Sequence, residues 1–269
     1  MPTLHERQLS ISGFFARPPC PALAAYVQRF WWLEGDCAAA YDVQLLHPDG
    51  ACGLIFNFAE PLQLDGVAHS AAALIAGPQL TSSRLQLAAR VKLMGVRFLP
   101  GMGSAFFGVG LDELSGFHID DWPGLGLAGL SDALAELDRD AQLRLVEREL
   151  LARLNDAQTR RSPVLQLLTQ IAAHQGRARV SDLMQAVPLG QRQLERLFRH
   201  QVGLTPKQFG RIQRVALVRG ELRVGGSLLD TALACGYADQ AHFIHDFKAV
   251  VGMTPGQYRL RAVATAERR

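Results

Sequence analysis

Two stretches of the sequence match or nearly match at seven of twelve positions: FRHQVGLTPKQF at residues 198–209 and FKAVVGMTPGQY at residues 247–258. A shift of 49 residues superimposes them without a gap. The matching pairs are Phe198 and Phe247, Val202 and Val251, Gly203 and Gly252, Thr205 and Thr254, Pro206 and Pro255, Gln208 and Gln257, and Phe209 and Tyr258. A match of this density indicates one supersecondary unit that occurs twice in the chain.

Each copy predicts a short helix, a break and a second helix, followed by Thr-Pro-x-Gln. That tetrapeptide is a capping box with proline at the first helical position, so it predicts the start of a further helix. In the first copy, Ser181 is the expected N-cap of the short helix, and residues 191–201 form the second. In the second copy, residues 228–234 form the short helix, and Asp239 caps the next one. Residues 206–223 predict one long helix between the copies.

A helix–break–helix unit whose second helix has a charged outer face can present side chains to the major groove of DNA. A guanidinium can bond both acceptors of guanine, and a glutamine can pair with adenine. The outer faces carry Arg192, Glu195, Arg196 and Arg199 in the first copy and Gln240, His242, His245 and Lys248 in the second. The long helix spans about 25–27 Å, which makes two such helices roughly one DNA turn (~34 Å) apart feasible.

The charge distribution favours a nucleic-acid partner for the C-terminal half alone. The net charge is +3. Residues 1–155 hold 11 Lys and Arg against 17 Asp and Glu, or −6, and residues 156–269 hold 17 against 8, or +9. Such an asymmetry is typical of a chain in which one part binds an anionic partner.

The 269 residues are enough for two domains, each with its own core. Apolar residues at helical spacing predict a helix over 132–154 with Ser131 as its N-cap, and Pro163 fits the first turn of another helix. The polar segment 155–162 between them is the expected boundary. We therefore expect a first domain over residues 1–155 and a DNA-binding domain over residues 163–263, with helix-turn-helix units at 180–201 and 228–250.

The first domain is expected to be rich in β-structure. Short apolar or alternating runs predict strands at residues 41–46, 53–58, 73–76, 84–88 and 91–98. Turn signals separate these runs, which favours an antiparallel sandwich or barrel. A leading helix is expected over residues 21–30, and Trp31 and Trp32 are expected in the core. The expected fold class is α+β with two domains: a β-rich barrel or sandwich with flanking helices, then an all-α domain with two helix-turn-helix units joined by a long helix.

Residues 164–261 resemble the DNA-binding region of AraC/XylS-type transcription regulators. The most recognisable stretch is ACGYADQAHF at residues 234–243, followed by Phe247-Lys248, Gly252, Thr254-Pro255 and Tyr258-Arg259. Members of that family carry two helix-turn-helix units joined by one long helix. The resemblance implies base-reading roles for Arg192, Glu195, Arg196, Gln240, Ala241, His242 and His245. The sequence departs from the family at Gly190, where a serine cap is usual, and at His245, where an arginine is common.

The implied partner is double-stranded DNA. Candidates for phosphate contacts are Arg199, Lys207, Arg211, Arg214 and Lys248, with Arg160, Arg161 and Arg177 as further ones. A small-molecule effector, RNA polymerase and a second copy of the chain are further candidate partners. No apolar run reaches the ~18 residues of a membrane span, no signal peptide begins the chain, and the four cysteines form no CxxC pair. We expect a soluble, cytoplasmic protein without a membrane partner.

The N-terminal half more loosely resembles an uncharacterised domain often fused to such regulators, in residues 24–32, 47–50 and 95–101. It has three candidate roles: modulating the regulator, dimerisation alone, or acting as a small-molecule-binding or metal-dependent module with DNA binding as an accessory. Arg97 and His47 are candidates for binding an anionic effector, although a structural ion pair is the favoured role of Arg97. His47, Asp49 and Cys52 lack the four-ligand spacing of structural zinc, and turn chemistry accounts for residues 48–50.

Neither a cofactor nor an enzymatic activity is expected. Residues 124–129 satisfy G-x-G-x-x-G, but no buried strand precedes them, so a lead into the helix that follows is the better interpretation. The sequence contains no nucleophile elbow, phosphate loop or catalytic triad. Metal ligands and catalytic residues are therefore both predicted to be absent.

Overall fold

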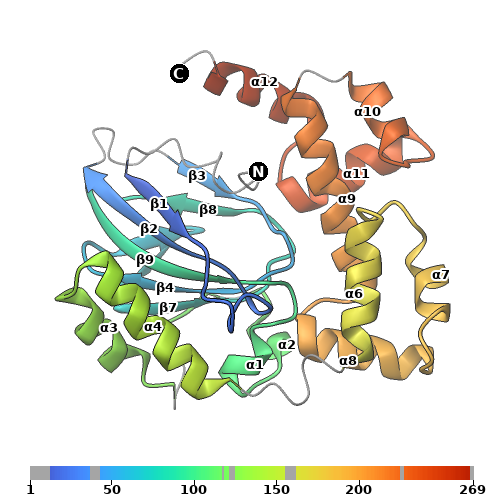
Figure 1. The fold of residues 1–269 in the computed structure, drawn as a ribbon. Coiled ribbons are helices and arrows are strands. Elements are labelled where there is room, and N and C mark those ends of the chain that lie inside the picture. The colour runs from blue at the N-terminus through green and yellow to red at the C-terminus, as the bar shows by residue number, and fades with distance from the viewer. Residues whose placement is uncertain are drawn as a thin grey trace.

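The computed structural model describes residues 13–36, 43–116, 118–120, 125–154, 162–224 and 227–266. Its first part is built of strands with flanking helices, and its last part is helical (Figure 1). The predicted fold class is therefore confirmed. The boundary expected within residues 155–162 lies outside the described residues, except for Ser162, which is the N-cap of the first helix of the helical part.

The larger sheet has six strands in the order β1-β2-β9-β4-β7-β10, and all the pairs are antiparallel. The strands are β1 (Phe14–Arg17), β2 (Val27–Asp36), β9 (Arg90–Phe98), β4 (Gly53–Asn57), β7 (Ala73–Ala76) and β10 (His118–Asp120). The two longest strands, β2 and β9, pair along nearly their whole length. β1 pairs with the outer side of β2, and β4 continues the sheet from β9.

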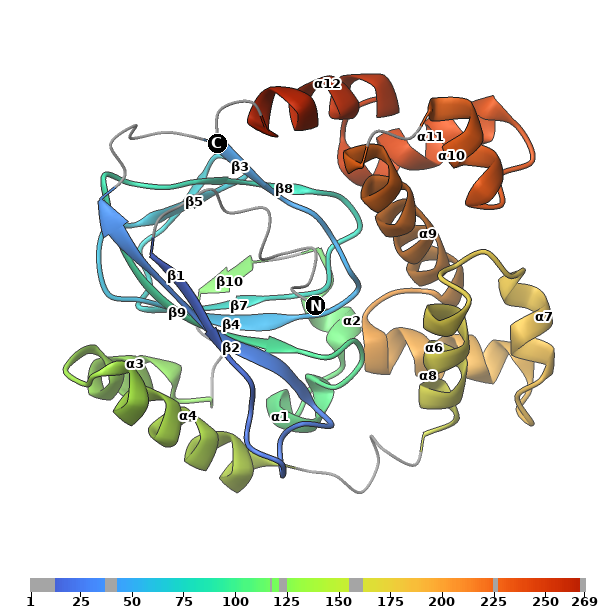
Figure 2. The same ribbon diagram turned by 45° about the horizontal axis from the view of Figure 1, so that its top comes forward.

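The smaller sheet has four strands in the order β3-β8-β5-β6, again all antiparallel. They are β3 (Val43–Leu46), β8 (Ser83–Gln86), β5 (Leu62–Leu64) and β6 (Val67–His69). The turn predicted at Asp65-Gly66 joins β5 to β6, and both of its residues have positive φ, as a tight hairpin turn requires. Figure 2 shows the two sheets opposite each other as a sandwich, and no pairing among the described strands closes them into a barrel.

The larger sheet is covered on both faces. One face packs on α1 (Ser104–Phe107), α2 (Leu111–Leu114), α3 (Leu127–Ala135) and α4 (Arg139–Arg153), with Phe30, Trp32 and Phe56 in that core. The other face packs on the smaller sheet through Leu33, Leu93 and their neighbours. Trp32 is in the core as predicted, whereas Trp31 is only partly buried and lies on the face toward the smaller sheet.

The leading helix expected over residues 21–30 is wrong. Residues 21–26 form turns, and β2 begins at Val27. The run VQRFWWL is rich in β-branched and aromatic residues, which suits a strand with both faces covered. The alanines before it suggested a helix, but pairing with β1 and β9 determines the conformation of the strand.

The single helix expected over residues 132–154 is in fact two helices, α3 and α4. Asp138 separates them as the N-cap of α4, and its Oδ1 accepts a hydrogen bond from Ala141 N at 2.8 Å. Ser131 is therefore no cap: it lies inside α3, and its hydroxyl donates to Ala72 O of the sandwich at 2.9 Å. The glycine-rich segment leads into α3 as predicted, with Gly126 as its N-cap, although Gly124 lies outside the described residues.

The helical part consists of α6 (Pro163–Ala173), α7 (Val180–Gln185), α8 (Gln191–Val202), α9 (Pro206–Arg223), α10 (Leu228–Ala234), α11 (Gln240–Val251) and α12 (Pro255–Ala266). They share one hydrophobic core, in which α9 is the central element. In both ribbon views this helical part lies beside the sandwich, with α9 running along the side that faces it (Figures 1 and 2).

None of the helices in the described part of the chain has both the length and the apolar character needed to cross a membrane.

A buried polar bridge joins the sandwich to α4 and predicts a stability effect. Trp32 Nε1 donates to Gln142 Oε1 at 2.7 Å, and Gln142 Nε2 donates to Leu134 O at 2.8 Å. The substitution Gln142→Leu leaves Trp32 Nε1 buried without a hydrogen-bond acceptor, whereas Leu134 O keeps the hydrogen bond from Leu137 N at 3.2 Å. We therefore expect a loss of about 1–3 kcal/mol in unfolding free energy. Urea unfolding followed by tryptophan fluorescence measures it. Arg144→Gln, at an exposed position of the same helix, is the control, and an equal loss in that variant would contradict the prediction.

Candidate nucleic-acid interface

The repeat found in the sequence is a repeat of structure. The helices α8 and α11 each have twelve residues, and their bounds, 191–202 and 240–251, differ by the same 49 residues at both ends. Short helices precede them, α7 and α10, and the long helices α9 and α12 follow. The predicted pair of helix–break–helix units is therefore confirmed, with α9 running from the first unit to the second.

Matching backbone signals end each second helix and start the next. Gly203 and Gly252 both take the left-handed conformation, with φ of 79° and 82°, and donate back to the carbonyls of Arg199 and Lys248. The predicted capping boxes then follow. Thr205 Oγ1 accepts from Gln208 N, and Thr254 Oγ1 accepts from Gln257 N, while the glutamine side chains accept from the threonine amides.

The N-termini of α8 and α11 differ. Asp239 caps α11 as predicted, because its Oδ1 accepts from His242 N at 2.7 Å. Gly190 is the N-cap of α8 and provides no side-chain hydrogen bond. In the first unit the short helix α7 begins after Arg179, so Ser181 lies in its first turn and is not the cap predicted from the sequence.

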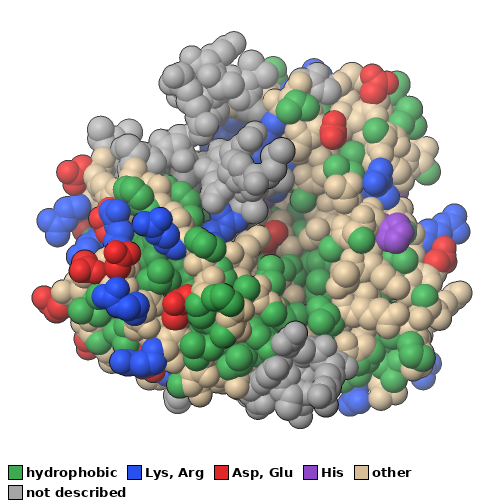
Figure 3. Space-filling view, viewed as in Figure 1, with side chains coloured by type: hydrophobic (Ala, Val, Ile, Leu, Met, Phe, Trp, Pro, Cys, Tyr) green, Lys and Arg blue, Asp and Glu red, His purple; other side chains and the backbone are tan. Residues whose placement is uncertain are grey.

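The outer faces of α8 and α11 are exposed. The inner face of α8 buries Leu194 and Phe198, and that of α11 buries Phe243 and Phe247. Every residue proposed from the sequence to read bases or to lie beside them on these helices is exposed: Arg192, Glu195, Arg196 and Arg199 on α8, and Gln240, Ala241, His242, His245 and Lys248 on α11. Figure 3 shows Lys and Arg side chains at the outer margin of the helical part, with hydrophobic side chains gathered toward the sandwich.

A buried carboxylate that the sequence reasoning missed fixes α11 against α9. Asp246 is 4% exposed and lies 3.0 Å from Arg211 Nε and 3.3 Å from His242 Nε2. The ring of His242 also meets Tyr237 edge-on, with centroids 5.4 Å apart. Asp246 follows Phe243 by three residues and is thus on the inner face of the helix, which is the only signal the sequence offers.

The phosphate candidates fall into two groups. Lys207, Arg199 and Lys248 are exposed. Arg211 and Arg214 have partners inside the protein: Arg211 pairs with Asp246, and Arg214 Nε donates to Gly176 O at 2.8 Å. Arg177 is exposed near the start of α7, and Arg160 and Arg161 lie outside the described residues.

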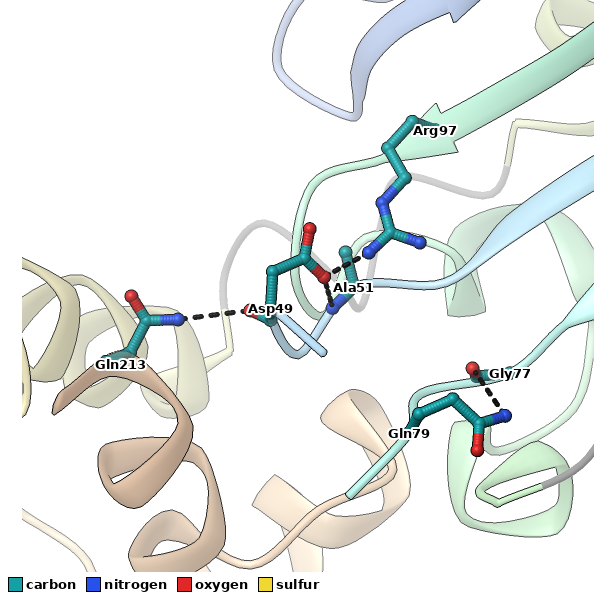
Figure 4. A network of polar contacts seen from close by, with 6 residues as sticks. All are labelled: Asp49, Ala51, Gly77, Gln79, Arg97 and Gln213. Carbon is teal, nitrogen blue, oxygen red and sulfur yellow. Dashed lines mark hydrogen bonds and ion pairs between the residues drawn. The ribbon is translucent and has the colours of Figure 1, made fainter. Parts of the chain in front are cut away.

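Of the three candidate metal ligands in this region, His47 and Asp49 have other polar partners. His47 Nδ1 lies 2.7 Å from Ser82 Oγ, and Asp49 forms an ion pair with Arg97 (Figure 4). Burial raises the pKa of the Cys52 thiol to about 12, which opposes the thiolate that a metal needs. In the described ranges, no three or more His, Cys, Asp and Glu residues form a group that could hold a metal ion. The ion pair favoured for Arg97 is present.

Two different protein families match the two parts of the chain. Residues 183–261 match the family described as "Helix-turn-helix domain", and residues 16–120 match the one described as "Domain of unknown function (DUF6597)". The chain is 34% identical over 83 residues to the HTH-type transcriptional regulator MtrA of Neisseria gonorrhoeae. The matched segment covers 30% of this chain and 27% of that protein. The chain is 34% identical over 139 residues to the HTH-type transcriptional activator RhaR of Klebsiella pneumoniae, which covers 50% and 49%.

The chain thus spans about half, or less, of the length of the curated relatives it matches. Among solved structures, it is similar to ToxT from Vibrio cholerae, with 11% identity, a TM-score of 0.46, and coverage of 93% of this chain and 98% of that chain.

Because only α11 has a side-chain hydrogen bond at its N-cap, substitution of that cap should weaken α11 and leave α8 unchanged. Asp239→Ala removes the hydrogen bond to His242 N, so we expect the amides of α11 to lose about 1 kcal/mol of protection against opening. Asp239→Gly is the matched control, since glycine at an N-cap costs only a few tenths of a kcal/mol relative to aspartate. Hydrogen exchange with mass spectrometry measures both. The α8 peptides provide an internal reference, and an equal loss there would show that the effect is not local.

Proposed function

The chain carries the paired helix-turn-helix region of the AraC/XylS family, and on that premise we propose that it is a transcription regulator that reads two successive major grooves of duplex DNA. The observation that carries the proposal is the repeat: two recognition helices, identical in length and in their C-terminal caps, each with its polar face exposed. The connecting helix α9 has 18 residues and a length of about 27 Å, which suits two sites about one helical turn apart.

The two helices offer different chemistry to the bases. On α8, Arg192 and Arg196 can each bond O6 and N7 of a guanine, and Glu195 can accept from the amino group of a cytosine. On α11, Gln240 can pair with adenine, and the methyl group of Ala241 can contact the methyl of thymine. His242 and His245 complete the base-reading set of α11. We therefore expect a G·C-rich first half-site and a second half-site with A·T pairs.

Phosphate contacts would supply affinity without sequence preference. Lys207, Arg199 and Lys248 are the residues we assign to this role, because their side chains are exposed. Arg211 and Arg214 remain candidates at the edge of the interface, but their contacts to Asp246 and Gly176 support a role in positioning α9 against its neighbours. The acidic N-terminal half would lie away from the DNA.

The N-terminal sandwich is proposed to modulate DNA binding. It encloses a cavity of about 130 Å³ between its sheets, which favours small-molecule binding over a role in dimerisation alone. Catalysis is not part of the proposal, because the sequence contains no nucleophile elbow, phosphate loop or catalytic triad. A regulator of this kind would act in the cytoplasm, with RNA polymerase or a second copy of the chain as further partners.

Selection of bound sequences from a random duplex library tests the proposal. The full chain is used at ~150 mM salt, so that non-specific phosphate binding is suppressed. We expect two short enriched blocks with centres about 10 base pairs apart. A single block would contradict reading by both helices, and the absence of any block, from protein that retains its helical circular dichroism, would contradict sequence-specific binding.

Substitutions on and beside α8 separate base reading from phosphate binding. Arg196→Ala should weaken binding to the selected site by about 1–3 kcal/mol and relax the preference at one base position. Lys207→Ala should weaken binding to all sequences alike and reduce the slope of log K against log[salt] by about 1. Fluorescence anisotropy on the selected duplex and on variants of it measures both effects. A uniform loss in Arg196→Ala would reassign Arg196 to phosphate binding.

A further inference from the structure

The cavity of the sandwich lies between the two sheets and extends to the loop that follows β3. Its volume of about 130 Å³ is near that of engineered protein cavities that bind benzene, and about ten times what a single water needs. The walls come from both sheets, and the loop residues His47, Pro48 and Ala51 border it at one end. The lining is apolar except at this end.

Two arginines mark the polar end of the cavity. Arg29 of β2 and Arg97 of β9 are direct cross-strand partners, and both line the cavity. Arg29 is 7% exposed, and the Arg97 side chain is 18% exposed. Within the described part of the chain, the buried Nε of Arg97 has no hydrogen-bond partner. Two adjacent cations in so apolar a space create a strong local preference for an anion.

The rest of the cavity is suited to an apolar body. Along β2 and β9 the residues that follow the arginines on this face are Trp31 opposite Gly95 and Leu33 opposite Leu93. At about 3.3 Å per residue, the floor runs roughly 13 Å from Arg97 to Leu93. A Cβ at residue 95 would overlap the indole of Trp31, so the glycine lets this ring lie across the strand as part of the floor. Phe14 stacks on the ring of Trp31.

We propose that this cavity binds a small organic acid, with its carboxylate on Arg97 and Arg29 and its apolar body over Trp31 and Leu33. Arg97 is at present paired with Asp49, whose side chain is 34% exposed at the mouth of the cavity. A ligand carboxylate would therefore take the place of the Asp49 carboxylate on Arg97. Binding of the ligand and the Arg97–Asp49 ion pair are alternatives.

The ion pair lies on the contact between the sandwich and the helical part. The main-chain oxygen of Asp49 accepts from Gln213 Nε2 of α9 at 3.0 Å (Figure 4). The next residue, Gly50, has φ of 82° and lies so close to Phe209 of α9 that a Cβ would overlap the ring. Phe209 in turn packs on Phe198 of α8, with centroids 6.0 Å apart. Release of Asp49 from Arg97 therefore loosens a loop that touches Phe209 of α9, the residue that packs on α8.

The same loop also reaches the second unit. His47 Nδ1 lies 2.7 Å from Ser82 Oγ, and the amide and hydroxyl of Ser82 both donate to Val250 O near the end of α11, at 2.8 and 3.1 Å. Both recognition helices are thus connected to the mouth of the cavity.

Ligand binding is tested on the full chain without DNA. The probes are the straight-chain monocarboxylates from butanoate to decanoate and 3-phenylpropanoate, each compared with the alcohol of the same carbon skeleton. We expect at least one carboxylate to raise the melting temperature and its alcohol to have little effect. Arg97→Gln should weaken that carboxylate by about 10-fold to 100-fold in calorimetric titration, as expected for a lost charge-assisted hydrogen bond. Arg90→Gln, exposed at the far end of the same strand, is the control and should bind as the parent chain does.

A second variant keeps the test decisive if Arg97→Gln fails to fold. Asp49→Asn removes the competing charge and keeps an oxygen for the hydrogen bond from Ala51 N, so it should bind the carboxylate more tightly than the parent chain. No stabilisation by any carboxylate, equal stabilisation by acid and alcohol, or weaker binding in Asp49→Asn would each overturn the proposal.

The regulatory step rests on the proposed DNA binding and is measured separately. The carboxylate should change the Kd for the selected duplex by about 5-fold to 150-fold in the parent chain. In Asp49→Asn, where the ion pair is already lost, the carboxylate should bind but leave the Kd for DNA nearly unchanged. An equal change in both proteins would remove Asp49 from the pathway. Loss of DNA binding in every protein, with carboxylate binding intact, would instead count against the DNA-binding function.

Discussion

Both recognition helices are held to the helix that follows them by the same contact between two aromatic rings. Phe198 of α8 packs on Phe209 of α9, and Phe247 of α11 packs on Tyr258 of α12, with centroids 6.0 and 5.5 Å apart. Each pair spans a left-handed glycine and a capping box, so the turn between the helices has few alternative conformations. The direction in which each exposed face points depends on these rings, since all four are buried and cannot shift without repacking the core.

The local signals of the sequence predicted this region well. The bounds of α9, α10 and α11 follow from capping boxes, N-caps and glycines, which act within four residues and are therefore readable without knowledge of the fold. The Gln191 start of α8 was also predicted, and its end differs by one residue. The prediction that failed in this region is Ser181 as the N-cap of α7. A serine caps a helix only from an extended position just before the first turn, and Ser181 lies inside that turn.

Long-range contacts decided the features that the sequence did not reveal. β2 is a strand because β1 and β9 pair with it, although the alanines before it favour a helix on local grounds. Ser131 is buried inside α3 and donates to Ala72 O, a residue 59 positions earlier in the chain. The contact between Asp49 and Gln213 joins residues 164 positions apart, and no periodicity or motif connects them. The exposed faces of α8 and α11 could be predicted from the sequence, but the connection between the two halves could not.

Phe209 contacts both Phe198 of α8 and the loop at Gly50. The two halves are therefore less modular than their separate hydrophobic cores suggest. In a chimera that joins this sandwich to the helical half of a relative, the loop at Gly50 would face the side chain that the relative has in place of Phe209. A smaller side chain there would leave a void, and a differently placed ring would meet the loop backbone. Exchange of domains among such proteins is thus restricted to partners in which the loop and the first turn of the long helix are exchanged together.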